Sequence, residues 1–147
     1  MKITVAVIGS RDYPSPHLVD VWIDHLVKRY GTDFHVVSGA CKGSPDKWGV
    51  VAAQCAGVPP ERILEIPAQW RRPDGSVDKR AGFDRNGLVM EQADLVLAFW
   101  DGHSNGTCDT MSKAVTAGKP VLVIYPDGRC ESWKPGQDIP AWWKKPA

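Results

Sequence analysis

The sequence has little excess charge and no apolar run of the roughly 20 residues that a membrane span needs. With 18 basic and 17 acidic residues, its formal net charge is +1. Proteins that bind nucleic acid without specificity usually carry a larger positive excess, so the charge argues against such a partner. The first residues run directly into a strand-like segment without a signal-peptide pattern. We therefore expect a cytoplasmic protein with no membrane partner.

Paired cysteine motifs and the common nucleotide-binding signatures are also missing. The four cysteines form no CxxC pair, and no histidine stands at metal-ligand spacing from them; they are Cys41, Cys55, Cys108 and Cys130. These features predict reduced thiols, no metal site and no disulfide framework. Neither GxGxxG after the first strand nor GxxxxGK[ST] is present, which excludes a standard dehydrogenase and a P-loop enzyme. We expect no resident cofactor.

Short β-branched apolar runs alternate with helical patterns along most of the 147 residues. The runs predict buried strands at 3–8, 34–37, 62–66, 95–99 and 121–125. Between them, the patterns predict helices at 16–30, 44–56, 80–93 and 108–117, with Ser15-Pro16 opening the first and Gly31 ending it. Strands that alternate with helices form parallel sheets with right-handed crossovers. The sequence thus predicts a Rossmann-like three-layer α/β/α sandwich with a mostly parallel five-stranded sheet.

Two segments depart from this alternation. Residues 70–79 are polar and contain the turn signal Pro73-Asp74-Gly75. Residues 128–147 are rich in proline and tryptophan, and we expect them to form a tail packed on the domain made by residues 1–127.

Small residues follow three of the predicted strands, in the turns 9–11, 38–43 and 104–107. Carboxyl ends of parallel strands meet at one edge of the sheet, where open α/β proteins bind ligands. Small residues there let backbone N–H groups approach an anion, and the next helix start adds partial positive charge. Each glycine is equally well explained by a tight turn alone. Arg11 is placed to bind a phosphate, whereas Arg85 could be a ligand residue or an exposed helix charge.

Several short motifs occur in the order found in one superfamily. The chain resembles the SLOG superfamily over about residues 2–125, and within it the small stand-alone YpsA-related branch. That superfamily also contains the Lonely Guy phosphoribohydrolases, DNA-processing proteins and nucleotide-sensing domains. The motifs are Gly9-Ser10-Arg11, Ser38-Gly39-Ala40 with Gly43 and Asp46, Ala68-Gln69-Trp70, Ala81-Gly82 with Arg85-Asn86 and Met90, residues 93–99, and Gly106-Thr107.

The resemblance implies a nucleotide-derived ligand at the carboxyl edge of the sheet, and it implies a homodimer. The residues expected to bind the ligand are Gly9, Ser10, Arg11, Ser38, Gly39, Gly43, Asp46, Arg85, Asn86, Ser104, Gly106 and Thr107. Lonely Guy enzymes carry PGGxGTxxE, whose Glu takes part in cleaving the N-glycosidic bond. Here that position is Thr110, so the remaining candidates for a catalytic carboxylate are Asp46 and Asp109.

Three functions remain open from the sequence. The first is a sensor or binding module for a nucleotide, such as a nucleoside phosphate or an ADP-ribose-like molecule. The second is a hydrolase that cleaves the N-glycosidic bond of a nucleotide. The third is a protein-interaction module with a relict pocket, acting through the aromatic tail.

Overall fold

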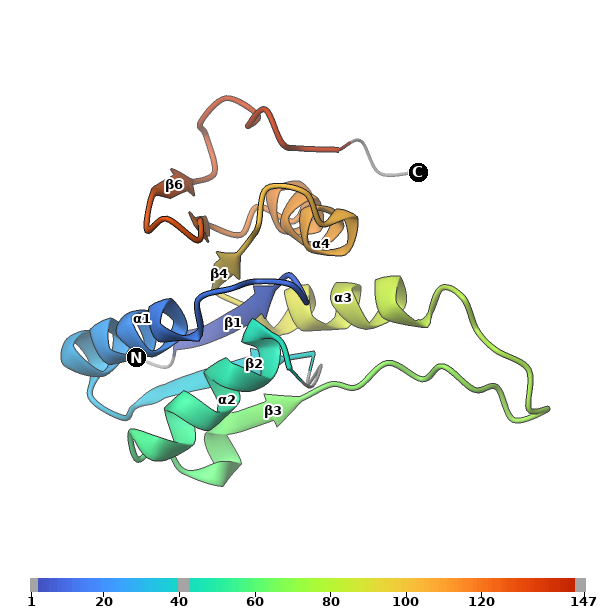
Figure 1. Cartoon of the computed structure of the whole chain (residues 1–147), viewed down its shortest axis with the longest axis horizontal. Coiled ribbons are helices and arrows are strands. Elements are labelled where there is room, and N and C mark those ends of the chain that lie inside the picture. The colour runs from blue at the N-terminus through green and yellow to red at the C-terminus, as the bar shows by residue number, and fades with distance from the viewer. Residues whose placement is uncertain (1–2, 40–42, 145–147) are drawn as a thin grey trace.

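The computed structural model describes residues 3–39 and 43–144, so Ala40 and Cys41 lie outside the described residues. Within these ranges, four α-helices, a short 3-10 helix and six strands follow one another (Figure 1). In chain order they are β1 (Ile3–Gly9), α1 (Pro16–Tyr30), β2 (Phe34–Ser38), α2 (Pro45–Cys55), η1 (Pro60–Arg62), β3 (Ile63–Glu65), α3 (Ala81–Gln92), β4 (Leu95–Phe99), α4 (Asn105–Thr116), β5 (Val121–Ile124) and β6 (Cys130–Trp133).

The strands form one mostly parallel sheet in the order β3-β2-β1-β4-β5-β6. This order fits a Rossmann-like fold, in which the chain builds outward from β1 in one direction and from β4 in the other. The sheet has six strands, not the expected five, because β6 pairs antiparallel with β5, with Cys130 opposite Ile124. The segment after residue 127 therefore begins by adding an edge strand to the sheet.

Helices cover both faces of the sheet, which makes three layers. Val5 and Val7 of β1 point to one face and pack in a core with α1 and α2. Ala6 and Ile8 point to the other face and pack with α3 and α4. Alternate residues of a strand point to opposite faces, so a nearly continuous apolar run is what a doubly covered strand requires.

Most element boundaries agree with the sequence expectation. Pro16 begins α1, and Gly31 ends it with φ of 65°, a conformation that favours glycine. The range predicted for the fourth strand, 95–99, is that of β4. One prediction was wrong: α4 begins at Asn105 and not at Cys108, because Ser104 caps it through a hydrogen bond from the Thr107 N–H to its side chain. Gly106 and Thr107 therefore lie in a helix and not in a loop.

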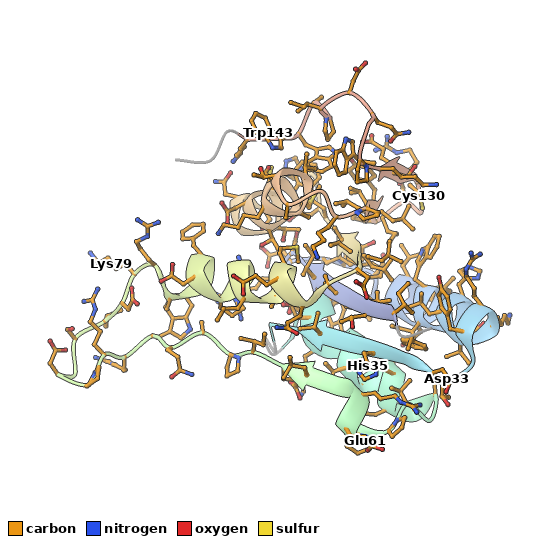
Figure 2. All side chains as sticks on the ribbon, turned by 180° about the vertical axis from the view of Figure 1, so that it is seen from behind. Asp33, His35, Glu61, Lys79, Cys130 and Trp143 are labelled. Atoms are coloured by element: carbon orange, nitrogen blue, oxygen red, sulfur yellow. The ribbon has the colours of Figure 1, made fainter. Side chains whose placement is uncertain are left out.

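The polar stretch between β3 and α3 projects from the rest of the molecule as an extended excursion (Figures 1 and 2). Its tip turns at Gly75, whose φ is 87°, and Arg71 pairs antiparallel with Val77. At the other end of the chain, the residues after β6 run over α4 (Figure 1). Among the described helices, none combines the length and apolar character that crossing a membrane would need.

Candidate functional site

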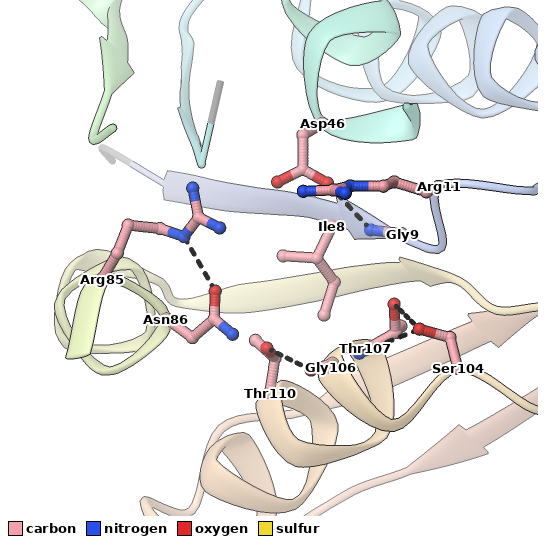
Figure 3. A pocket seen from close by; sticks show the side chains of 10 residues that line it. All are labelled: Ile8, Gly9, Arg11, Asp46, Arg85, Asn86, Ser104, Gly106, Thr107 and Thr110. Atoms are coloured by element: carbon pink, nitrogen blue, oxygen red, sulfur yellow. Dashed lines mark hydrogen bonds between the residues drawn. The ribbon is translucent and has the colours of Figure 1, made fainter. Parts of the chain in front are cut away.

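A pocket of about 170 Å³ lies where the ends of β1 and β4 run side by side. Strand order reverses at this point, and the crevice at such a reversal is the usual ligand site of open parallel sheets. Its walls come from the end of β1, the first turn of α2, one face of α3 and the first turns of α4 (Figure 3). The lining residues are Ile8, Gly9, Arg11, Asp46, Arg85, Asn86, Ser104, Gly106, Thr107 and Thr110.

The first turn of α4 forms one wall and brings backbone donors to the pocket. The first N–H groups of a helix have no partner within the helix and carry partial positive charge. Ser104 accepts a hydrogen bond from the Thr107 N–H at 3.5 Å, whereas no capping bond reaches Gly106 among the described residues. A side chain at Gly106 would project into open space, because no atom lies within 4 Å of the position of its Cβ. This wall can therefore receive an anion.

Ser10 lies behind this wall and is buried. Its hydroxyl lies 3.4 Å from the Thr107 hydroxyl and accepts a hydrogen bond from the Asp101 N–H. The Asp101 carboxylate in turn accepts N–H bonds from His103 and Ser104. Burial alone would raise the pKa of Asp101, but these donated bonds outweigh it and lower the pKa. Ser10 thus holds the turn after β4 against the turn after β1, and it does not line the pocket.

Packing explains why residue 9 is a glycine. A Cβ there would lie 2.4 Å from Cγ of Pro45 and 2.8 Å from the carbonyl oxygen of Phe99. The Gly9 N–H donates to Oδ1 of Asp46 at 3.1 Å. This donor is therefore already used inside the protein, and a phosphate in the pocket would have to be bound by other groups.

Asp46 places a carboxylate in the wall that α2 contributes. The residue is 8% exposed and lies in the first turn of α2, where its Oδ1 also lies 3.5 Å from the Ser44 hydroxyl. Burial raises the pKa of Asp46 to about 6, although the Arg85 guanidinium and the bond from Gly9 act in the opposite direction. The pKa of Asp46 thus lies close to neutral pH, whereas the pKa of an exposed aspartate lies far below it.

Arg85 and Asn86 come from the inner face of α3. The Nε of Arg85 donates to Oδ1 of Asn86 at 2.9 Å, and its Nη1 donates to the carbonyl of Gly39. A Cβ at Gly39 would lie 2.7 Å from both Nη1 of Arg85 and Oδ2 of Asp46. The absence of a side chain at Gly39 therefore allows the guanidinium and the carboxylate to face the same pocket.

The remaining predicted residues fall into two groups. Arg11 lines the pocket and is exposed, and its side chain makes no ion pair within the described ranges. Ser38 is buried behind the pocket and donates to the carbonyl of Asp46 at 2.8 Å. Gly43 is exposed with φ of 72° and does not line the pocket. The structure thus brings together most of the predicted ligand residues, whereas Ser10, Ser38, Gly39 and Gly43 support or surround them.

Of the two candidate carboxylates, only Asp46 reaches the pocket. Asp109 forms an ion pair with Lys113 at 2.8 Å and lies away from the lining. Thr110 does line the pocket, and its hydroxyl donates to the Gly106 carbonyl at 3.0 Å. Adjacent helix residues differ in direction by about 100°, so Asp109 and Thr110 cannot share a face. Ile8 and Thr110 were missing from the predicted lining, although the four-residue spacing from Gly106 to Thr110 indicates a shared helix face.

No family model, no curated protein and no solved structure matched the chain. Within residues 3–39 and 43–144, no group of three or more histidine, cysteine or acidic side chains could hold a metal ion. The site is thus defined by its own geometry: a small polar pocket at the reversal point of a parallel sheet, with two arginines, a helix start and one buried carboxylate.

Proposed function

We propose that the protein binds a nucleotide or nucleotide-derived ligand in this pocket, as a sensor or binding module of SLOG type with a Rossmann-like fold. The observation that carries the proposal is the convergence of Arg11, Arg85 and the first turn of α4 on one pocket. A helix start with unpaired N–H groups binds phosphate, and guanidinium groups add charge-assisted hydrogen bonds. Nucleoside phosphates and ADP-ribose-like molecules share this phosphate chemistry.

Asp46 supports a ligand that carries hydroxyl groups as well as phosphate. An ionised carboxylate only accepts hydrogen bonds, so it repels a phosphate and attracts a hydroxyl donor. Asp46 lies on the α2 wall, whereas Arg85 lies on the α3 wall, Arg11 lies on the turn after β1, and the start of α4 offers backbone N–H groups. A ribose phosphate suits both the carboxylate and the phosphate-binding groups, because its phosphate can bind at the start of α4 while a sugar hydroxyl donates to Asp46.

A thermal-shift screen against a nucleotide panel, with inorganic phosphate as the reference, tests the proposal. A ligand at 100 times its Kd adds about 2.7 kcal/mol to the free energy of unfolding. For the best ligand, Arg11→Ala should weaken binding by about 10- to 150-fold, because a charged hydrogen bond contributes roughly 1.5–3 kcal/mol.

The matched control is Arg29→Ala. Arg29 is also exposed, but it lies in the last turn of α1, near the amino ends of the strands and away from the pocket at their carboxyl ends. This variant should bind like the wild type. A panel without any stabilising ligand, or equal affinity in the Arg11→Ala variant, would contradict the proposal and favour an interaction module.

A second candidate function is hydrolysis of the N-glycosidic bond of a nucleotide, which the raised pKa of Asp46 favours. A carboxyl group with a pKa of about 6 can serve as a general acid near neutral pH. Thr110 offers only a hydroxyl dipole at the position of the Lonely Guy Glu, and the loss of one such electrostatic group typically costs on the order of 10²–10³ in rate. We expect no useful turnover of nucleoside monophosphates. Free base released by the wild type but not by the Asp46→Asn variant would instead make the protein an enzyme.

A further inference from the structure

The pocket at the sheet edge is too small to enclose a whole nucleotide. Its volume is about 170 Å³. Pockets that enclose a small molecule usually measure roughly 300–1,000 Å³. A nucleotide bound there therefore leaves part of itself outside. If its phosphate lies at the start of α4 and a sugar hydroxyl lies at Asp46, the part outside is the base.

A base that leaves the pocket outward passes the first turn of α3. This helix begins at Ala81, and its first turns reach past the ends of the strands (Figure 1). Arg85 and Asn86 line the pocket from the second turn. Gly82 stands three and four residues earlier, so it lies on the same face of the helix. One turn rises about 5.4 Å, which places Gly82 about that far outward from the lining residues.

The indole of Trp70 packs against the helix at this point. A Cβ on Gly82 would lie 3.1 Å from Cη2 and 3.6 Å from Cζ2 of Trp70, so the edge of the six-membered ring touches the first turn of α3. The absence of a side chain at Gly82 allows this close approach. Trp70 is nevertheless 47% exposed, which leaves much of its ring accessible to another group.

Hydrogen bonds at the base of the excursion hold Trp70 in place. Its carbonyl accepts a bond from the Asp78 N–H at 2.7 Å, and the Asp78 carbonyl accepts one from the Ala81 N–H at 3.2 Å. The backbone of Trp70 is thus tied to the start of the helix on which its ring packs. A side chain that is already ordered before binding loses little entropy when a ligand contacts it.

We propose that Trp70 binds the base: the base of a nucleotide held in the pocket stacks on the accessible part of the Trp70 indole. This inference rests on the proposed function, and it adds that the protein recognises a base as well as a phosphate. The ligand class is then a nucleoside phosphate or its derivative, and not a simple sugar phosphate. Stacking on an aromatic side chain accepts any base, because every base has a π face.

Two probes with the same sugar and phosphate isolate the contribution of the base. They are adenosine 5′-monophosphate and ribose 5-phosphate, and isothermal titration calorimetry measures the affinity of each. The wild type should bind the adenosine probe about 5- to 150-fold more tightly, which is the range for one base stacked on an aromatic side chain.

Trp70→Leu keeps apolar atoms against Gly82 and removes the π face. This variant should lose most of the preference for the adenosine probe and keep the wild-type affinity for ribose 5-phosphate. Trp70→Phe should retain part of the preference, because it keeps an aromatic ring. A Trp70 that only supported the start of α3 would instead change the two affinities together.

Phe83→Leu is the control. Phe83 is an aromatic residue with a similar exposure of 45% at the same end of α3. It lies about 100° farther around the helix than Gly82, and the Lys113 ammonium lies 5.4 Å from the centre of its ring. The Phe83→Leu variant should keep the wild-type preference for the adenosine probe.

The outcomes separate this inference from the proposed function. A wild type that binds neither probe would overturn both. Equal affinity of the wild type for the two probes would leave phosphate binding intact and overturn the role of Trp70. So would a Trp70→Leu variant that is folded by circular dichroism and loses affinity for both probes by the same factor, or an equal loss of preference in the Phe83→Leu variant.

Discussion

The buried carboxylate of Asp46 should make the wild-type protein lose stability as the pH rises from about 4 to about 7. In the unfolded chain an aspartate has its ordinary pKa of 3.8, whereas in the folded protein burial raises that of Asp46 to about 6. Between these values the unfolded state has released the proton and the folded state still holds it. The unfolded state then binds fewer protons, so the free energy of unfolding falls with pH. Well below pH 3.8 and well above about pH 6 this contribution is constant.

The difference between the two pKa values corresponds to roughly 3 kcal/mol, at about 1.4 kcal/mol for each tenfold change in the equilibrium. Asp46→Asn removes the titration but keeps an oxygen that can accept the Gly9 N–H. The free energy of unfolding of this variant, minus that of the wild type, should therefore increase by roughly 2 kcal/mol between pH 4 and pH 7, and the rest of the difference appears only below pH 4. Urea titrations at several pH values measure this difference, since contributions from other groups cancel.

Two further variants test whether the pH dependence of stability comes from Asp46. The Arg85 guanidinium opposes the effect of burial, so Arg85→Ala should move the titration of Asp46 to higher pH. The pKa of exposed Asp74 is lowered, first of all by the Ser76 hydroxyl, so its contribution to stability is lost as the pH falls. The free energy of unfolding of the Asp74→Asn variant, minus that of the wild type, should therefore change with pH in the opposite direction. A carbon NMR titration that places Asp46 near pH 4, or a flat difference between the Asp46→Asn variant and the wild type, would refute the reasoning.

Substitutions at three glycines separate binding from folding. Gly106→Ala should stabilise α4 by about 0.5–1 kcal/mol and yet weaken ligand binding, and the larger Gly106→Val should abolish binding with an unchanged circular dichroism spectrum. Melting curves and ligand titrations on the same samples would contradict this if binding persisted. Gly39→Ala should displace Arg85 and lower affinity with little loss of stability, which a titration checks. Gly9→Ala should instead lower the melting temperature with or without ligand, because its Cβ would overlap Pro45.

The sequence by itself determined the alternation of strands and helices and most of their limits. These features depend on local chemistry: β-branched runs such as 95–99 form buried strands, Pro16 fits the first turn of a helix, and Gly31 adopts the positive φ that ends it. The order of elements also determined the edge of the sheet at which the small-residue turns would meet. The residue pattern alone therefore places Arg11 at this edge, whereas it leaves Arg85 open, and only the resemblance implies that Arg85 lies near the same site.

Only the tertiary structure decided the sixth strand and the role of each small residue at the site. The segment Cys130–Trp133 has no apolar alternation of its own and becomes a strand because β5 offers it a free edge. Gly9 is required by a contact with Pro45, which is 36 positions away in the sequence. Asp46 has its raised pKa because packing removes it from water. Distances between remote residues and exclusion of water arise only when the chain has folded, and the chemistry of this pocket depends on both.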